Sequence, residues 1–106
     1  MSETLLVLTT MPNHDGAVKL AGRLVEAGLA GCVNISAPVT SIYRWDGEMQ
    51  QGTEVMLTIK TPAERYPALQ QAIVDGHPYE LPEVIAVPIT TGLDRYLAWI
   101  ETCTRN

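Results

Sequence analysis

Several classes of protein are excluded by what this sequence lacks. It has no run of lysine or arginine, and its 12 acidic residues outnumber its 7 basic ones, which gives a formal net charge of −5. Proteins that follow a nucleic-acid backbone need clustered positive charge, so we expect no nucleic-acid partner. The chain has only two cysteines, Cys32 and Cys103, too few for the disulfide framework of a small secreted domain. We therefore expect a reducing, cytoplasmic compartment.

Long apolar runs and the common catalytic motifs are missing as well. The N-terminal region has no basic segment and no sufficiently long apolar stretch, so we expect neither a signal peptide nor a membrane span. No glycine-rich phosphate loop, CxxC pair, HExxH or GxSxG occurs, which excludes the enzymes that those motifs define. The 106 residues are 46% hydrophobic, which is typical of one globular domain over residues 1–106.

The spacing of the apolar residues predicts four strands and three helices. Asn13 or Asp15 is the expected N-cap of the first helix, and Asp46-Gly47 predicts a tight hairpin turn. Thr61-Pro62-Ala63-Glu64 has the pattern of a capping box with proline at the first helical position. In chain order the predicted elements are a strand over 5–8, a helix over 17–25, strands over 32–45 and 53–60, a helix between 61 and 76, a strand over 84–89 and a helix over 91–100.

This order, βαββαβ followed by a helix, is that of a ferredoxin-like α+β sandwich. Right-handed crossovers place the first and third strands in the centre of one antiparallel sheet, and the second and fourth at its edges. Pro38 and Pro88 lie inside the two predicted edge strands, where a missing N–H is tolerated. Pro38 therefore indicates an edge position or a bulge within the long strand over 32–45.

The predicted sandwich leaves apolar surface uncovered. Two helices cover only one face of the sheet, yet the strands over 5–8 and 84–89 are apolar on both faces. The long edge strand over 32–45 invites pairing with another chain. A closed homo-oligomer covers the open face and joins such edges, so we expect obligate oligomerisation.

The densest polar cluster is the loop His77-Pro78-Tyr79-Glu80-Leu81-Pro82-Glu83. Its prolines restrict the backbone, which suits a binding site, although they also suit a plain turn in which His77 caps helix carbonyls. His77 and Glu80 have the chemistry of divalent-metal ligands, but two ligands do not define a site. Glu80 and Glu83 also have the chemistry of an acid–base pair, for which no nucleophile is identified.

Four further residues have alternative interpretations. Lys60 shares a predicted strand face with Glu54, and a salt bridge to Glu54 is favoured over a bound anion as its partner. Trp45 precedes the hairpin turn, where a half-exposed indole is typical of an interface or a ligand platform. Tyr96 and Trp99 lie three residues apart on one helix face, and core packing is favoured there over an inter-subunit contact.

Five short motifs follow one another along almost the whole chain. They are Gly31-Cys32-Val33-Asn34-Ile35, Tyr43-x-Trp45-x-Gly47, Lys60-Thr61, His77-Pro78-Tyr79-Glu80-x-Pro82-Glu83 and Tyr96-Leu97-x-Trp99. Together they resemble the CutA family of divalent-cation-tolerance proteins. The resemblance implies a cytoplasmic, ferredoxin-like homotrimer similar in build to the PII signalling proteins, with sheets associated edge to edge around a threefold axis. It also implies a role in tolerance of divalent metals, with copper binding and without established catalysis.

The resemblance implies site residues near inter-subunit clefts. For a small ligand they are Trp45, Lys60, Tyr79, Glu80 and Glu83, and for a metal His77. The family's copper site uses a first-strand thiol and two adjacent histidines, whereas this chain has Thr9 and Gly76 at the thiol and first-histidine positions. The soft ligand that selects Cu(I) is therefore missing, and the implied metal is copper or another divalent cation, not an obligatory cofactor. The alternatives are a PII-like signalling or partner-docking trimer, and a cleft enzyme using His77, Glu80 and Glu83.

Overall fold

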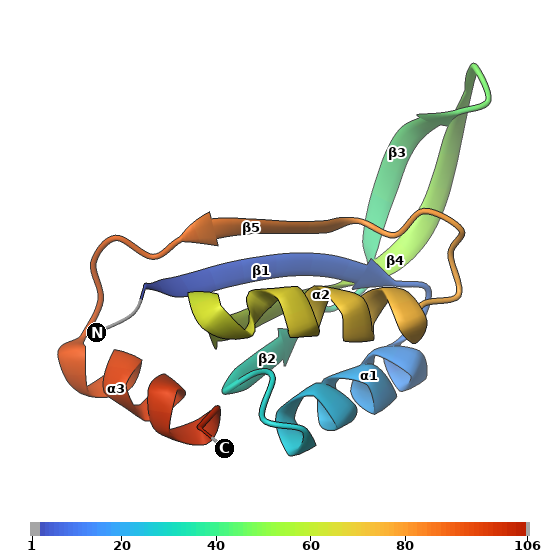
Figure 1. Cartoon of the computed structure of the whole chain (residues 1–106). Helices are drawn as coiled ribbons and strands as arrows, with labels where there is room; N and C mark the ends of the chain where they lie inside the picture. The colour runs from blue at the N-terminus through green and yellow to red at the C-terminus, as the bar shows by residue number, and fades with distance from the viewer. Residues whose placement is uncertain (1–2, 106) are drawn as a thin grey trace.

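The computed structural model describes residues 3–105, which are built around one antiparallel sheet (Figure 1). The strands within these residues are β1 (Thr4–Met11), β2 (Cys32–Ile35), β3 (Val39–Trp45), β4 (Glu48–Pro62) and β5 (Val84–Pro88). The order across the sheet is β2-β4-β1-β5, and β3 pairs with β4 beyond β2. The first strand and the hairpin's return strand are therefore central, as predicted, and the ferredoxin-like α+β fold is confirmed.

The helices are α1 (His14–Glu26), a short 3₁₀ turn η1 (Ala63–Arg65), α2 (Tyr66–Asp75) and α3 (Asp94–Cys103). The predicted cap of the first helix is confirmed, because the Gly16 N–H donates to Asn13 Oδ1 at 2.8 Å. The hairpin turn is confirmed too: Asp46 and Gly47 both have positive φ, 51° and 78°, as a two-residue hairpin connection requires. The β3–β4 hairpin extends well beyond the rest of the sheet (Figure 1).

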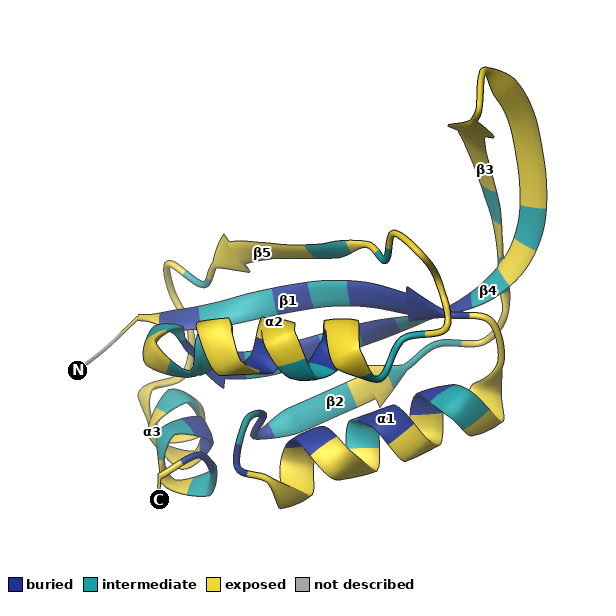
Figure 2. Cartoon of the chain, turned by 45° about the vertical axis from the view of Figure 1, so that its right-hand side comes forward, coloured by how far each residue is buried: buried dark blue, intermediate teal, exposed yellow. Residues whose placement is uncertain are grey.

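Helices α1 and α2 cover one face of the sheet (Figures 1 and 2). On that face Val7 of β1 pairs with Ile59 of β4, and both side chains are fully buried. They form a core with apolar residues of both helices, namely Leu20, Leu24, Leu69 and Ile73. This face accounts for the single hydrophobic core of the described chain.

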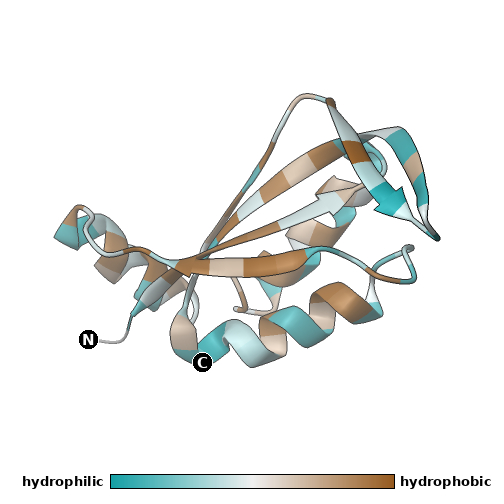
Figure 3. Cartoon of the chain, turned by 90° about the horizontal axis from the view of Figure 1, so that it is seen from above, coloured by the Kyte–Doolittle hydropathy of each residue, from teal (hydrophilic) through white to brown (hydrophobic). Residues whose placement is uncertain are grey.

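The other face of the sheet is also apolar but lacks such cover. Side chains alternate along a strand, so Leu6 and Leu8 of β1 lie on the face opposite Val7. Their partners in β5 are Val87 and Ile85, which are 49% and 52% exposed. Viewed from above, β5 and β1 carry long hydrophobic stretches (Figure 3). The predicted excess of apolar strand surface is therefore present in the folded chain.

The prediction of one strand over 32–45 is wrong, because residues 36–38 separate β2 from β3. Ile35 pairs with Leu57 and Val39 pairs with Glu54. The chain therefore advances four residues from β2 to β3 while the partner strand β4 advances three. This extra residue is a bulge, as Pro38 indicated, since proline cannot donate to the ladder. β4 is also longer than the predicted 53–60, because the hairpin continues to the turn.

The predicted capping box at Thr61-Pro62-Ala63-Glu64 is wrong as well. Thr61 is buried within β4, and its hydroxyl donates to the Leu29 carbonyl at 2.8 Å instead of capping a helix. The helix proper begins at Tyr66 after the 3₁₀ turn, with no side-chain cap at Arg65. The last helix begins at Asp94, within its predicted range, and also lacks a side-chain cap.

Candidate functional site

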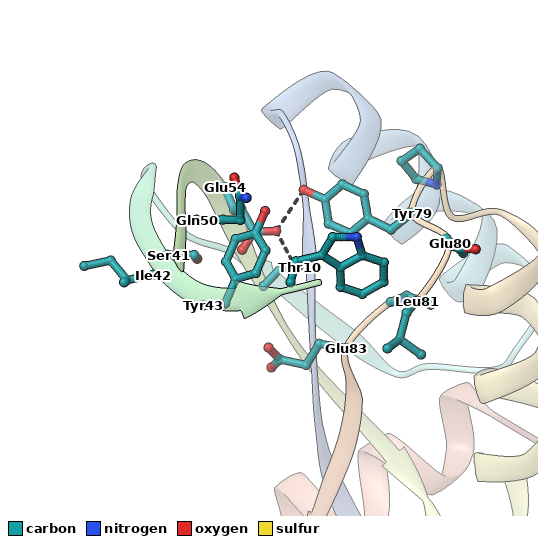
Figure 4. Close-up of a pocket in the computed structure, with 13 residues that line it drawn as sticks. Thr10, Ser41, Ile42, Tyr43, Gln50, Glu54, Tyr79, Glu80, Leu81 and Glu83 are labelled. Atoms are coloured by element: carbon teal, nitrogen blue, oxygen red, sulfur yellow. Dashed lines mark hydrogen bonds between the residues drawn. The ribbon is translucent and has the colours of Figure 1, made fainter. Parts of the chain in front are cut away.

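The clearest cavity lies between one side of the β3–β4 hairpin and the loop that follows α2. Its volume is about 1060 Å³, at the upper limit of the roughly 300–1,000 Å³ of small-molecule sites. The two sides come together because β3 and β4 bend away from the sheet while residues 77–83 pass over the end of β1 (Figures 1 and 4). We call this cavity the hairpin pocket. It is lined by Thr10, Ser41, Ile42, Tyr43, Trp45, Gln50, Glu54, Pro78, Tyr79, Glu80, Leu81, Pro82 and Glu83.

Glu54 of β4 is the polar centre of the hairpin pocket. Its Oε2 atom accepts hydrogen bonds from the Tyr79 hydroxyl at 2.8 Å and the Thr10 hydroxyl at 3.0 Å (Figure 4). Burial raises the pKa of the Glu54 carboxyl, but hydrogen bonds from Ser41, Tyr79 and Thr10 lower it below its ordinary value. Glu54 is therefore a carboxylate at neutral pH.

Tyr79 joins the loop to the hairpin through the same hydrogen bond. Burial, the hydrogen bond to Glu54 and the negative charge of Glu54 raise the pKa of Tyr79 to about 12. The phenol is therefore protonated at neutral pH and acts as the donor to Glu54. A nearby carboxylate and a protonated phenol stabilise each other's ionisation states, which holds the loop against the strand.

His77 lies beside the hairpin pocket and holds the loop to β1. Its Nδ1 accepts from the Tyr79 N–H at 3.1 Å, and its Nε2 lies 2.6 Å from the Thr10 carbonyl oxygen. Since a carbonyl only accepts, the Nε2 atom carries a proton. Both ring nitrogens are thus engaged, and the ring reaches β1 instead of capping the carbonyls of α2. A metal binds His77 only if one of these hydrogen bonds breaks.

The predicted site residues are divided between two ends of β4. Trp45, Tyr79, Glu80 and Glu83 line the hairpin pocket, and His77 contacts it through Tyr79. Lys60 does not, because it lies six residues beyond Glu54, about 20 Å along a strand that advances about 3.3 Å per residue.

The favoured salt bridge between Lys60 and Glu54 is therefore wrong. Lys60 Nζ instead donates to Asn34 Oδ1 and lies 3.8 Å from Cys32 Sγ on the neighbouring strand β2. Burial and a hydrogen bond to Cys32 raise the pKa of Tyr96, which brings α3 into the same cluster. The rings of Tyr96 and Trp99 are 5.7 Å apart, but both are partly exposed, so the expectation of core packing is wrong.

Sequence reasoning missed Glu54 as a pocket residue, together with Thr10, Ser41 and Tyr43. From the sequence, Glu54 was only the favoured salt-bridge partner of Lys60, on a strand that alternates apolar and polar residues. Its partner Tyr79 lies 25 residues away in the chain, and Thr10 lies 44 residues away. The bulge at 36–38 decides which residues of β3 face Glu54. Pro38 indicated an edge position or a bulge there, but not which of the two.

Within residues 3–105, no group of three or more His, Cys, Asp or Glu side chains lies close enough to hold a metal ion. Cys32 and Cys103 are both free thiols. None of the helices described is long and apolar enough to cross a membrane. The hairpin pocket is therefore an open acidic and aromatic cavity, not an assembled metal centre.

The fold and the pocket together define a ferredoxin-like α+β domain with an acidic cavity at one end of its sheet. The model of the family described as CutA1 divalent ion tolerance protein matches residues 5–103. The divalent-cation tolerance protein CutA of Thermus thermophilus is 42% identical over 93% of this chain and 96% of its own length. The chain belongs to the CutA1 divalent ion tolerance family.

Solved structures of relatives agree closely with this fold. CutA1 from Shewanella sp. SIB1 has a TM-score of 0.95 at 46% identity, covering 99% of this chain and 98% of that one. A protein titled periplasmic divalent cation tolerance protein CutA, from Archaeoglobus fulgidus, has a TM-score of 0.93 at 32% identity, covering 96% and 99%. The chloroplastic protein CutA of Arabidopsis thaliana is 42% identical over 97% of this chain, which spans only 57% of that protein.

Proposed function

We propose that this protein acts in tolerance of divalent cations by binding such a cation directly at the hairpin pocket, without catalysis. The observation that carries the proposal is the charge of the pocket. Three carboxylates line it, those of Glu54, Glu80 and Glu83, and no lysine or arginine is among the residues that line it. Family membership in the CutA1 divalent ion tolerance family supports the same role.

Glu80 and Glu83 are the proposed cation ligands. Glu54 already accepts hydrogen bonds from Tyr79 and Thr10, so it contributes negative charge more than an open coordination position. Both Glu80 and Glu83 are exposed residues of one loop. Hydrated hard cations commonly bind through one or two carboxylates and keep several waters, which matches a pocket without a preassembled ligand cluster.

Copper is a less favoured cation in this proposal than a harder one. Thr9 is fully buried on the helix-covered face, and it provides a hydroxyl where the resemblance implies a thiol. Gly76 has no side chain to coordinate, and both nitrogens of His77 are engaged. Oxygen donors dominate the pocket, and these suit manganese or magnesium better than Cu(I).

The functional unit in this proposal is a homotrimer in the cytoplasm. The half-exposed Ile85 and Val87 on the open face of the sheet support burial against other copies of the chain. The two free thiols support a reducing compartment. Partner docking and PII-like signalling are compatible with such a trimer.

Calorimetric titration with Mn²⁺, Zn²⁺ and Cu²⁺ tests the proposed site. The variant Glu80→Gln/Glu83→Gln is expected to bind Mn²⁺ about ten-fold or more weakly, since it loses the carboxylates nearest the cation. The control Glu3→Gln/Glu26→Gln removes two exposed carboxylates away from the pocket and leaves the net charge equal to that of the first variant. Equal Mn²⁺ affinity in the two variants, or no heat with any of the three cations, would contradict the proposal.

A further inference from the structure

Lys60 and Cys32 face each other at the end of β4 that is remote from the hairpin pocket. They are directly opposite in the ladder between β2 and β4, so their side chains lie on the same face, with Cβ atoms about 4.5–5.5 Å apart. The Lys60 Nζ atom donates to Asn34 Oδ1 and lies 3.8 Å from Cys32 Sγ. An amine and a thiol of one chain are therefore held close together.

Neighbouring elements fix the position of both groups. The Tyr96 hydroxyl of α3 forms a hydrogen bond with Cys32. A Cβ atom added at Gly31, the residue before Cys32, would lie only 2.8 Å from Ile100 Cδ1, so α3 packs directly on this segment. The Gly31 N–H also donates to the Lys60 carbonyl oxygen at 2.9 Å. The sulfur is therefore held between α3 and the lysine of β4.

The contact between Lys60 and Cys32 lies outside the site described above. Neither residue lines the hairpin pocket, Cys32 is a free thiol, and both side chains are partly buried on the open face of the sheet. Their pairing is set within one chain by the register of two strands, so it does not depend on which copies cover that face. A reaction between the two groups needs the entry of a small oxidant and no room for a docked ligand.

The chemistry that this contact favours is oxidative. Cysteine sulfur is oxidised stepwise, and an oxidised sulfur is captured by a nearby thiol or nitrogen. The Lys60 ammonium group first releases a proton to solvent. The S–H bond of Cys32 and one N–H bond of the Lys60 amine then break, one oxygen atom of dioxygen enters between Sγ and Nζ, and the other leaves as water with both hydrogens. Sulfur and nitrogen each lose two electrons, and dioxygen accepts all four.

We propose that Cys32 and Lys60 form a redox modification site, in which dioxygen converts the pair into a covalent Sγ–O–Nζ link between β2 and β4. The link joins residues 28 positions apart, so it restrains the unfolded chain as other cross-links do. Thiols of a reducing compartment reverse such oxidation, so the link marks exposure to oxidant. This inference goes beyond the cation binding proposed at Glu80 and Glu83 and does not depend on it.

Intact-mass spectrometry of the full chain tests the link. Protein purified without oxygen and with a reductant is expected to gain about 14 Da in air-saturated buffer, because one oxygen is gained and two hydrogens are lost, and to return to its starting mass with dithiothreitol. Fragmentation is expected to show the peptides of Cys32 and Lys60 joined. An unchanged mass would overturn the proposal. So would a gain of about 32 Da alone, which is the sulfinic acid of an isolated thiol.

Variants assign the added oxygen to this pair. Lys60→Arg keeps a cation but removes the primary amine, and Cys32→Ser removes the sulfur, so neither is expected to gain this mass. The control Lys19→Arg changes the other lysine of the chain, which lies on α1, and is expected to react like the parent. Cys103→Ser removes the second thiol and is expected to react like the parent too. The same gain in Lys60→Arg, or its loss in Cys103→Ser, would overturn the proposal.

Discussion

The two faces of the sheet carry similar side chains but differ in what covers them. Leu57 and Ile59 of β4 are fully buried beneath α1 and α2 (Figure 2). Ile85 and Val87 of β5, on the opposite face, are half exposed. The apolar composition of the two faces predicts equal burial, whereas α1 and α2 cover only one of them and leave Ile85 and Val87 on the other half exposed. This comparison is the reason for proposing that other copies of the chain complete the fold.

The largest expected effect comes from comparing the stability cost of substituting one residue on each face of the sheet. Leu57→Ala leaves a cavity in the covered core and is expected to lower the free energy of unfolding by about 3 kcal/mol. Ile85→Ala removes a side chain of similar size and is expected to cost a comparable amount only if other copies bury it. Urea unfolding at high protein concentration measures both changes.

Dilution sharpens this contrast. As the chains separate, the cost of Ile85→Ala is expected to shrink while that of Leu57→Ala stays constant, because only the first depends on contacts between copies. A cost of Ile85→Ala that is small at every concentration would show that nothing covers the open face.

A smaller effect concerns the hydrogen bond between Tyr79 and Glu54 at the hairpin pocket. Tyr79→Phe is expected to cost about 1 kcal/mol at pH 7, since it removes one partly exposed hydrogen bond to a carboxylate. The folded-state pKa of Tyr79 is raised from 10.0 to about 12, so its contribution is present below pH 10 and is lost as the pH rises through 12. The pKa of Glu54 is lowered from 4.5, so its contribution is present above pH 4.5 and is lost as the pH falls.

The measurement is the difference in unfolding free energy between the parent and Tyr79→Phe across this pH range. The difference is expected to shrink between pH 10 and 12, where the parent's Tyr79 ionises. A difference that stays constant over that interval would mean that the hydrogen bond does not hold the loop.

The smallest effect lies on the covered face itself. Thr9 is fully buried, and its hydroxyl is the one buried side-chain polar atom of the described chain without a hydrogen-bond partner. Thr9→Val keeps the shape and removes the unsatisfied hydroxyl, so it is expected to raise stability by about 1 kcal/mol. Thermal unfolding measures the change. A loss of stability would mean that the Thr9 hydroxyl is hydrogen-bonded in solution, for example to a bound water.

The local features of this molecule that were predicted correctly are set by residues close together in the chain. Asn13 caps α1 within three residues, and Asp46-Gly47 turns the hairpin by itself. Thr61 misled the prediction because its local pattern fits a helix cap, while the Leu29 carbonyl, 32 residues away, binds its hydroxyl. The order of the strands followed from crossover geometry, which depends only on the sequence of elements.

The candidate site was harder to predict for the same physical reason. Tyr79, Glu80 and Glu83 stand out because one stiff loop carries them. Glu54 joins them only through the fold, and Lys60, although it shares a strand face with Glu54, lies at the other end of that strand. Alternation places Glu54 and Lys60 on one strand face, but six residues along a strand separate them by about 20 Å, so strand geometry alone already excludes the salt bridge that was favoured.

The mass of the purified protein in solution, measured by light scattering at micromolar concentration, tests the central claim most directly. If other copies cover the open face of the sheet, the protein is expected to have the mass of three 11.6 kDa chains. A stable species with the mass of one chain would contradict the account, because the half-exposed Ile85 and Val87 would then face water in the functional molecule.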